Sequence, residues 1–269
     1  MEFRTRVDIP KPSFQIEPCE EMLFVGSCFA DSIGRRFAEE QFRATVNPYG
    51  VMYNPASVLH TMERYEGKPR VAFLTLGTNH VYRLKETGEI VDNCQKRPAA
   101  LFLEEQLSVD ECADYLCRTV DQLCSRRPDT HVVLTVSPIR YHKYGYHESQ
   151  LSKATLLLAI DKVTSHHLSH LPSPPSYFPA YEIMLDELRD YRFYKEDMLH
   201  PSSQAVEYIW QQLVDNYFSP AAKQFLREWA PLKAAFGHRP FNADSAAYQA
   251  FITETKAKAE QLLRKYSSH

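Results

Sequence analysis

The chain has 269 residues, of which 44% are hydrophobic, and this is enough apolar material for one large α/β domain with additions. Its formal net charge of -3 gives none of the basic surface that nucleic-acid binding needs, so no nucleic-acid partner is expected. No apolar run approaches the ~20 residues that cross a bilayer, and the charged first ten residues do not resemble a signal peptide. These features predict a cytoplasmic protein without a membrane partner.

Apolar periodicity gives the expected elements of the first half. In chain order, it predicts a buried strand at 22–25, a sharp turn, and an amphipathic helix at 31–41. A helix at 55–65 follows, with Pro55 in its first turn, and then a strand at 71–76. The runs 81–84 and 89–91, on either side of Thr87-Gly88, predict a small hairpin.

The second half continues the alternation. Ser108 and Glu111 form a capping-box pattern that predicts a helix ending near 125, and 131–136 is a third apolar strand. The remaining expected elements are a helix at 148–165, an extended segment at 177–184, helical turns at 185–189, and helices at 204–217 and 244–266. Such alternation is typical of a mostly parallel sheet between helices. We therefore predict a single-domain α/β fold with about five strands and a C-terminal helical appendage.

The cysteines give no sign of a disulfide framework or of a cofactor. There are six, none in a Cys-x-x-Cys pair, and without an export signal disulfides are not expected. The spacing of Cys112, Cys117 and Cys124 roughly follows one helical face, which favours buried thiols over a metal site. The histidines His166, His167 and His170 resemble a zinc site in composition only, because adjacent residues on a helix point in different directions. No metal or other cofactor is expected.

Polar residues follow three of the predicted strands. These segments are Gly26-Ser27-Cys28, Gly77-Thr78-Asn79 and Ser137-Pro138-Ile139-Arg140. In an open α/β sheet, ligands bind beyond the carboxyl ends of the strands, so we expect the functional site there. A fourth candidate segment, Asp197 to Pro201, leads directly into a helix.

Asp197 and His200 are the most informative pair in these segments. A carboxylate three residues before a histidine, in a turn, can accept the Nδ1 proton and leave Nε2 free to take a proton from a nucleophile. The alternative is that Asp197 caps the following helix and His200 is an ordinary surface residue. The short pattern alone does not decide between the two.

The sequence Gly26-Ser27-Cys28-Phe29-Ala30 is the motif that names the GSCFA family, and the chain resembles that family of the SGNH/GDSL hydrolase superfamily over roughly residues 19–218. The first motif looks like the Gly-Asp-Ser block of the superfamily. Further along, Gly50 looks like the second block, Gly77-Thr78-Asn79 the third, and Asp197 to Pro201 the fifth, all in the right order. The resemblance implies an SGNH/flavodoxin-like catalytic domain at 15–218, with 219–269 as a helical extension packed on it.

The resemblance also implies roles for these residues. A first-block nucleophile would attack a carbonyl, with His200 as the base and Asp197 orienting it. Gly50 and Asn79 would donate hydrogen bonds to the oxyanion, together with the backbone N–H after the nucleophile.

The register of the first block leaves the nucleophile open. Aligning Gly26 with the glycine of Gly-Asp-Ser places Ser27 at the aspartate position and Cys28 at the serine position. A cysteine at a helix N-terminus beside a histidine is a favourable nucleophile, so Cys28 is preferred. The alternatives are attack by Ser27 after a one-residue shift, with Cys28 a buried apolar residue, or no covalent chemistry.

Four further residues are candidates for substrate binding. Arg140 could hold a carboxylate or phosphate of the substrate, or form a structural ion pair instead. Lys153, Glu182 and Cys94 could line the pocket or belong to the scaffold.

The sequence therefore predicts an esterase, acyl hydrolase or acyltransferase that acts on a small-molecule or glycan ester or thioester. The alternative is a non-catalytic binding module that keeps the fold, which the absence of the usual Gly-Asp-Ser serine favours. The oligomeric state does not follow from the sequence.

Overall fold

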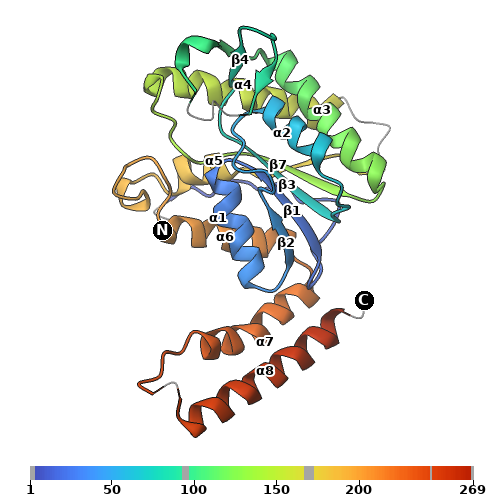
Figure 1. The fold of residues 1–269 in the computed structure, drawn as a ribbon, viewed down its shortest axis with the longest axis vertical. Coiled ribbons are helices and arrows are strands. Elements are labelled where there is room, and N and C mark those ends of the chain that lie inside the picture. Colours follow the sequence, from blue (N-terminus) through green and yellow to red (C-terminus); the bar gives the residue numbers. More distant parts are fainter. Residues whose placement is uncertain (1–3, 93–96, 167–172, 243, 268–269) are drawn as a thin grey trace.

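A five-stranded parallel sheet forms the centre of the computed structural model, which describes residues 4–92, 97–166, 173–242 and 244–267 (Figure 1). Its strands lie in the order β2 (Arg43–Val46), β1 (Glu21–Gly26), β3 (Val71–Leu76), β7 (His131–Val136) and β8 (Ser176–Tyr177). All four neighbouring pairs are parallel, so the carboxyl ends of β1, β3 and β7 lie at the same edge.

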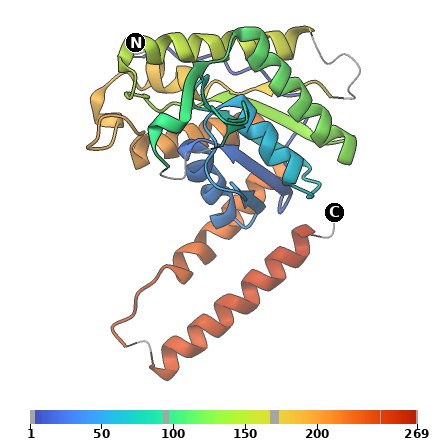
Figure 2. The same ribbon diagram turned by 45° about the horizontal axis from the view of Figure 1, so that its top comes forward.

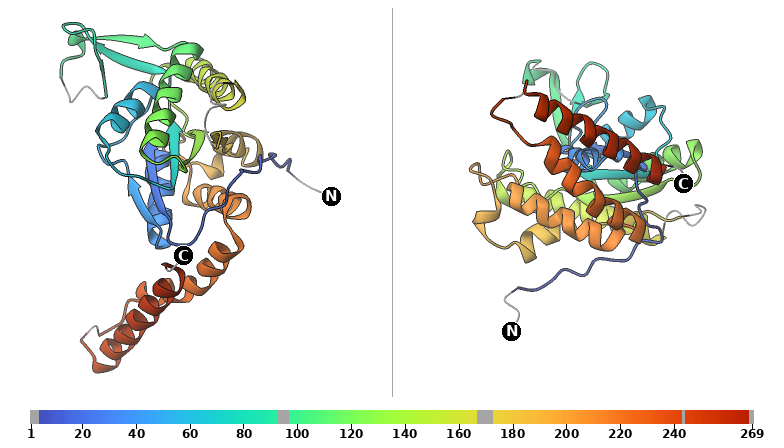
Figure 3. Two further views of the ribbon diagram at one scale, coloured as in Figure 1. Left: turned by 90° about the vertical axis from the view of Figure 1, so that its right-hand side faces the viewer. Right: turned by 90° about the horizontal axis from the view of Figure 1, so that it is seen from below.

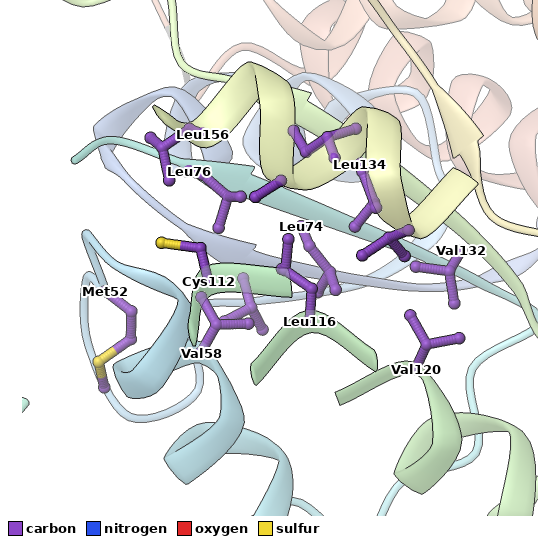
Figure 4. Packing of buried hydrophobic residues seen from close by; sticks show 14 of the residues in the cluster. Met52, Val58, Leu74, Leu76, Cys112, Leu116, Val120, Val132, Leu134 and Leu156 are labelled. Atoms are coloured by element: carbon purple, nitrogen blue, oxygen red, sulfur yellow. The ribbon is translucent and has the colours of Figure 1, made fainter. Parts of the chain in front are cut away.

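Helices cover both faces of this sheet because its central strands are apolar on both sides. Leu23 and Val25 of β1 face a cluster with α2 (Pro55–Arg64), α3 (Val109–Arg126) and α4 (Gly145–His166). Met22 and Phe24 point the other way, toward α1 (Cys28–Glu39) and α6 (Ser203–Tyr217). Figure 4 shows the first of these layers, in which leucines of β3 meet side chains of α2, α3 and α4. The predicted α/β architecture is confirmed.

A second, antiparallel sheet lies beyond α2 and α3, at one end of the molecule (Figure 3). It has three strands, β4 (His80–Leu84), β5 (Ile90–Val91) and β6 (Phe102–Gln106), in the order β5-β4-β6. The pair β4 and β5 is the hairpin expected around Thr87-Gly88.

Two C-terminal helices form a hairpin that projects from the opposite end (Figures 1 and 2). They are α7 (Pro220–Phe236) and α8 (Ala246–Ser267), and a small cluster of Phe225, Trp229 and Leu262 joins them. The hairpin is tied to the end of α1, where Trp229 Nε1 donates to the Glu39 carbonyl at 3.1 Å and Lys233 pairs with Glu39 and Glu40.

Most predicted elements are present, with one correction. The segment 177–184 is not extended: β8 ends at Tyr177, and helical turns begin with α5 (Ala180–Glu182) and continue as a π-helix over Ile183–Glu187. Strands β2 and β6 and helix α7 were not predicted. No helix within the described residues has the length and apolarity required to cross a membrane.

Candidate active site

A tight turn joins β1 to α1 at the carboxyl edge of the sheet. Gly26 has a φ of +140°, and a Cβ added there would overlap the Thr75 carbonyl oxygen of the neighbouring strand. Only glycine therefore allows the chain to turn this close to β3. Asn47 Oδ1 accepts the Gly26 N–H at 2.9 Å, and the Ser27 N–H donates to the Thr75 carbonyl at 3.1 Å.

The turn gives Ser27 a structural position. Ser27 is 1% exposed and is the N-cap of α1, where its Oγ accepts the Phe29 N–H at 3.2 Å. The same hydroxyl donates to Ser137 Oγ at 2.9 Å and lies 3.1 Å from Thr75 Oγ1. This hydroxyl cluster joins the ends of β1, β3 and β7.

Cys28 is the first residue of α1, which begins three residues before the predicted start at residue 31, and it faces a cavity. Its side chain is half-buried, and its Sγ lies 3.9 Å from the Tyr53 hydroxyl. It lines a cavity of about 330 Å³ whose wall is formed by the ends of β1, β3 and β7, the start of α4 and the loop before α6. The lining residues are Ser27, Cys28, Tyr53, Gly77, Ser137, Ile139, Arg140, Tyr141, His142, Lys143, Lys153, Leu199 and His200.

His200 enters this cavity from the loop before α6, and Asp197 holds its ring. His200 Nδ1 lies 2.6 Å from Asp197 Oδ2, while Asp197 Oδ1 accepts the N–H groups of Leu199 and His200 at 2.8 and 2.9 Å. These three hydrogen bonds lower the pKa of Asp197 to about 2, so the carboxylate is ionised at neutral pH. The N-cap of α6 is Ser202 rather than Asp197. Nε2 is the ring nitrogen that this pairing leaves for another partner.

Arg140 fixes the loop that carries His200 against the end of β7. Its backbone N–H donates to the Leu199 carbonyl at 3.1 Å, and its Nη1 donates to the Met198 carbonyl at 3.1 Å. The guanidinium also lies over the ring of Tyr146, 4.3 Å from its centroid. Within the described residues, no carboxylate pairs with Arg140, and the side chain borders both the Cys28 cavity and an adjoining cavity of about 440 Å³.

Lys153 reaches the same cavity from α4. It is 2% exposed, and its Nζ donates to the carbonyl oxygens of Gly77 at 2.7 Å and Ser137 at 2.9 Å. Burial lowers the pKa of Lys153 to about 7.

The two residues expected to donate to an oxyanion are engaged elsewhere. The Gly50 N–H donates to the Asn47 carbonyl at 2.9 Å, and Asn79 Nδ2 donates to the Leu107 carbonyl at 2.7 Å. Neither residue is in the wall of the Cys28 cavity.

Glu182, a substrate-binding candidate, is likewise not in this wall. Glu182 accepts hydrogen bonds from the Tyr177 hydroxyl at 2.7 Å on both carboxylate oxygens, and burial raises its pKa. Cys94 lies outside the described residues, as do His167 and His170 of the histidine cluster.

The sequence did not single out the aromatic side of the cavity. Tyr53 and Tyr141 lie with their ring centroids 6.4 Å apart, beside Cys28, and burial is the main cause that raises the pKa of Tyr53 to about 12. Tyr53 also holds the end of β3, since its carbonyl accepts the N–H groups of Gly77 and Thr78. The only sequence feature that could have pointed to Tyr53 is its position just before the predicted helix start at Asn54-Pro55.

Two family profiles match the chain. That of the GSCFA family matches residues 21–72 and 66–213, and that of the GSCFA domain protein, C-terminal domain, matches residues 229–268. The chain belongs to the GSCFA family. The first match contains every residue of the Cys28 cavity, and the second lies in the hairpin of α7 and α8. No curated protein matches this GSCFA chain in sequence.

Solved structures similar to this GSCFA chain are distant from it. A Streptococcus pneumonia protein named after platelet activating factor is 15% identical, with a TM-score of 0.49 over 76% of this chain and 85% of its own. An acetyl esterase mutant solved with an acetate ion is 12% identical (TM-score 0.44, 77% and 98% covered). A carbohydrate esterase family 3 from Talaromyces cellulolyticus is 11% identical (TM-score 0.41, 77% and 98% covered). No activity of the GSCFA chain follows from these likenesses.

The other described cysteines of this GSCFA chain lie in the scaffold. Burial raises the pKa of Cys112 to about 12 and also raises the pKa values of Cys117 and Cys124. Cys19 is buried as well, beside the C-terminal hairpin. Among the described residues, no group of three or more acidic, histidine or cysteine side chains could hold a metal ion.

Proposed function

We propose that this GSCFA protein is a member of the SGNH/GDSL hydrolase superfamily that hydrolyses or transfers an acyl group, with Cys28 as the nucleophile, His200 as the base and Asp197 as the residue that orients the base. The observation that carries the proposal is that Cys28 and His200 line one cavity while Asp197 holds His200 Nδ1 at 2.6 Å. The catalytic part is residues 15–218, and 219–269 is an extension outside the chemistry.

The reaction follows from this arrangement. His200 Nε2 takes the proton of the Cys28 thiol, and Sγ forms a bond to the carbonyl carbon of an ester or thioester. The carbonyl electron pair moves to oxygen and then returns, breaking the bond to the leaving group, which takes the proton from His200. Water or an acceptor hydroxyl then attacks the acyl-thioester, again with His200 as the base, and frees Cys28.

The environment of the first block supports Cys28 over Ser27. The Ser27 hydroxyl is buried, caps α1 and is hydrogen bonded to Ser137, so attack would require breaking the turn. The Cys28 thiol is half-exposed to the cavity. A nucleophilic thiol also suits the cytoplasmic location expected from the sequence, because thiols are kept reduced there.

The substrate is proposed in outline only: a small-molecule ester or an O-acyl group on a glycan. Arg140 is the candidate for holding an anionic part of it, because its guanidinium borders the cavity and pairs with no carboxylate among the described residues.

A panel of variants tests the proposal on short acyl esters and thioesters. Cys28→Ala and His200→Ala should each lower turnover by roughly 10²–10⁴-fold, because the nucleophile or its base is removed. Cys28→Ser should keep part of the activity, since a hydroxyl can use the same base. The melting temperature of His200→Ala should stay close to that of the parent, because backbone atoms of His200 hold the loop: its carbonyl accepts the Lys195 N–H, and its N–H donates to Asp197 Oδ1.

His147→Ala is the matched control, because His147 is exposed on α4 and lies outside the cavity wall; it should behave like the parent. Full activity of Cys28→Ala together with an inactive Ser27→Ala would assign the attack to the serine. Absence of turnover in the parent would favour the binding module.

A further inference from the structure

Lys153 is a buried cation without a described counter-ion. No carboxylate among the described residues lies within ion-pair distance of its Nζ, and its hydrogen bonds go to two backbone carbonyls. Removing an ammonium group from water without a paired charge is strongly unfavourable. Methionine would fill a similar volume without this penalty, so packing alone does not account for a lysine here.

The position of Lys153 connects it to the nucleophile turn. The two carbonyls that it binds belong to Gly77 and Ser137, which directly follow β3 and β7 and both line the Cys28 cavity. Ser137, one of these residues, also accepts the Ser27 hydroxyl at 2.9 Å, and Ser27 directly precedes Cys28. Ser137 therefore connects the ammonium group to Ser27, the N-cap of α1, through two hydrogen bonds.

One of the Lys153 donors remains for the cavity. An ammonium group has three N–H donors, and two are used on the carbonyls of Gly77 and Ser137. The ammonium group also makes a cation–π contact with the Tyr181 ring, whose centroid is 5.6 Å from Nζ, but this contact is not a hydrogen bond to an oxygen or nitrogen. Lys153 itself is part of the cavity wall, so a bound molecule can meet the third donor.

The site also needs such a donor. Attack on an ester carbonyl places a negative charge on oxygen, and preorganised donors must meet that charge. The Gly50 N–H and one N–H of the Asn79 side chain donate to protein carbonyls, and neither residue lies in the wall of the Cys28 cavity.

We propose that the Lys153 ammonium is the charged donor that binds the carbonyl oxygen of the substrate and stabilises the oxyanion formed when Cys28 attacks. This inference rests on the proposed acyl chemistry of Cys28. Lys153 donates a hydrogen bond and keeps its proton throughout, while His200 carries out the proton transfers. The structure thus assigns to a lysine of α4 the task that the third-block asparagine was expected to perform.

Two alkylating reagents of equal reach test the charge next to Cys28 without requiring any ester turnover. Iodoacetate and iodoacetamide both alkylate a thiol, and they differ in whether an anionic carboxylate or a neutral amide enters the cavity. We would measure both labelling rates at Cys28 by peptide mass spectrometry about one pH unit below the Lys153 pKa of about 7, where the ammonium is protonated, and take the ratio of iodoacetate to iodoacetamide. Both rates refer to the same thiol in the same variant. Changes in the accessibility of Cys28 or a general loosening of the fold therefore affect both rates alike, and the ratio reports the effect of reagent charge.

In the parent, this ratio should exceed the ratio for Cys28 in the urea-denatured chain. In Lys153→Met and Lys153→Gln it should fall about tenfold, which is the size expected for one charge interaction in a partly buried site. Lys143→Met is the matched control: Lys143 lines the same cavity but pairs with Glu104 at 3.1 Å, so its removal should change the ratio much less.

An unchanged ratio in both folded Lys153 variants would overturn the proposal. If neither variant folds, the parent decides: a native ratio no higher than the denatured one would equally overturn it. The ratio could fall as expected in a protein that turns over no ester. That result would support a charged Lys153 beside Cys28 and refute the proposed acyl chemistry, so failure of the Lys153 proposal and failure of the proposed function are distinguishable. With ester turnover present, Lys153→Met should also lower kcat far more than it changes KM, because an oxyanion forms only in the transition state.

Discussion

At the scale of single residues, two neighbours of the first block have opposite environments. Ser27 is buried, caps α1 and hydrogen bonds to Ser137, whereas Cys28 is half-exposed in the cavity. The difference arises because Ser27 is the last non-helical residue and Cys28 the first helical one. One residue of register along the chain thus separates a structural hydroxyl from the proposed nucleophile.

Lys153 gives a prediction about stability and pH. Burial lowers its pKa in the folded protein to about 7, while an unfolded lysine has a pKa of about 10.4. Below pH 7 both states bind the proton, and the folded state carries the full penalty of the buried charge. As the pH rises from about 7 to about 10, the folded state releases the proton first, so the stability should rise by at most about 1.4 kcal/mol per pH unit.

Urea unfolding of the parent and of Lys153→Met measures this effect. The difference between the two free energies of unfolding isolates Lys153, because tyrosines and cysteines that titrate in the same range are common to both proteins. The parent should gain stability relative to the variant from about pH 7 to about pH 9. A difference that stays constant over this range would show that the buried ammonium carries no such penalty.

At the scale of elements, the turn between β1 and α1 requires a glycine at position 26, and Gly50 provides a control for the effect of backbone strain alone. Both Gly26 and Gly50 have positive φ angles, but only Gly26 faces the carbonyl of Thr75, whereas nothing lies within 4 Å of an added Cβ at Gly50. Gly50→Ala should therefore destabilise the protein by about 1–2 kcal/mol from backbone strain alone.

Gly26→Ala adds the steric overlap with Thr75 and should destabilise the fold by about 3–5 kcal/mol. The urea midpoints of the two variants give the comparison. Equal midpoints would mean that the close approach of β1 and β3 does not constrain this turn.

The elements that the sequence predicted correctly are those with a clear apolar period or a local cap. The strand 71–76 and the helix after Ser108 have the expected bounds within a residue or two, and the capping box of Ser108 and Glu111 is present. The prediction of an extended segment at 177–184 was wrong. A run that is buried on every side has no apolar period that distinguishes a strand from a helix, and the buried residues here are Phe178, Ala180, Tyr181, Ile183 and Met184. Strand β2 is a short, half-exposed edge strand without an apolar run.

At the scale of the whole molecule, the fold unites segments that are far apart in the chain. The parallel register of β1, β3 and β7 brings their polar ends to one edge, as the sequence predicted, and the loop before α6 adds His200. The pairing of Asp197 with His200 was predictable because it is local. The orientations of Asn79 and Lys153 were not, because each depends on a carbonyl supplied by another segment.

The most direct test of the account is to trap the acyl-enzyme. The parent protein would be mixed with an acetate ester, quenched in acid at early times, digested and examined by mass spectrometry for the site of acetylation. The account predicts an acetyl group on Cys28 that forms before product accumulates and is absent from Cys28→Ala. An acetyl group on Ser27, or product formation with no acetylated first-block peptide at any time, would contradict it.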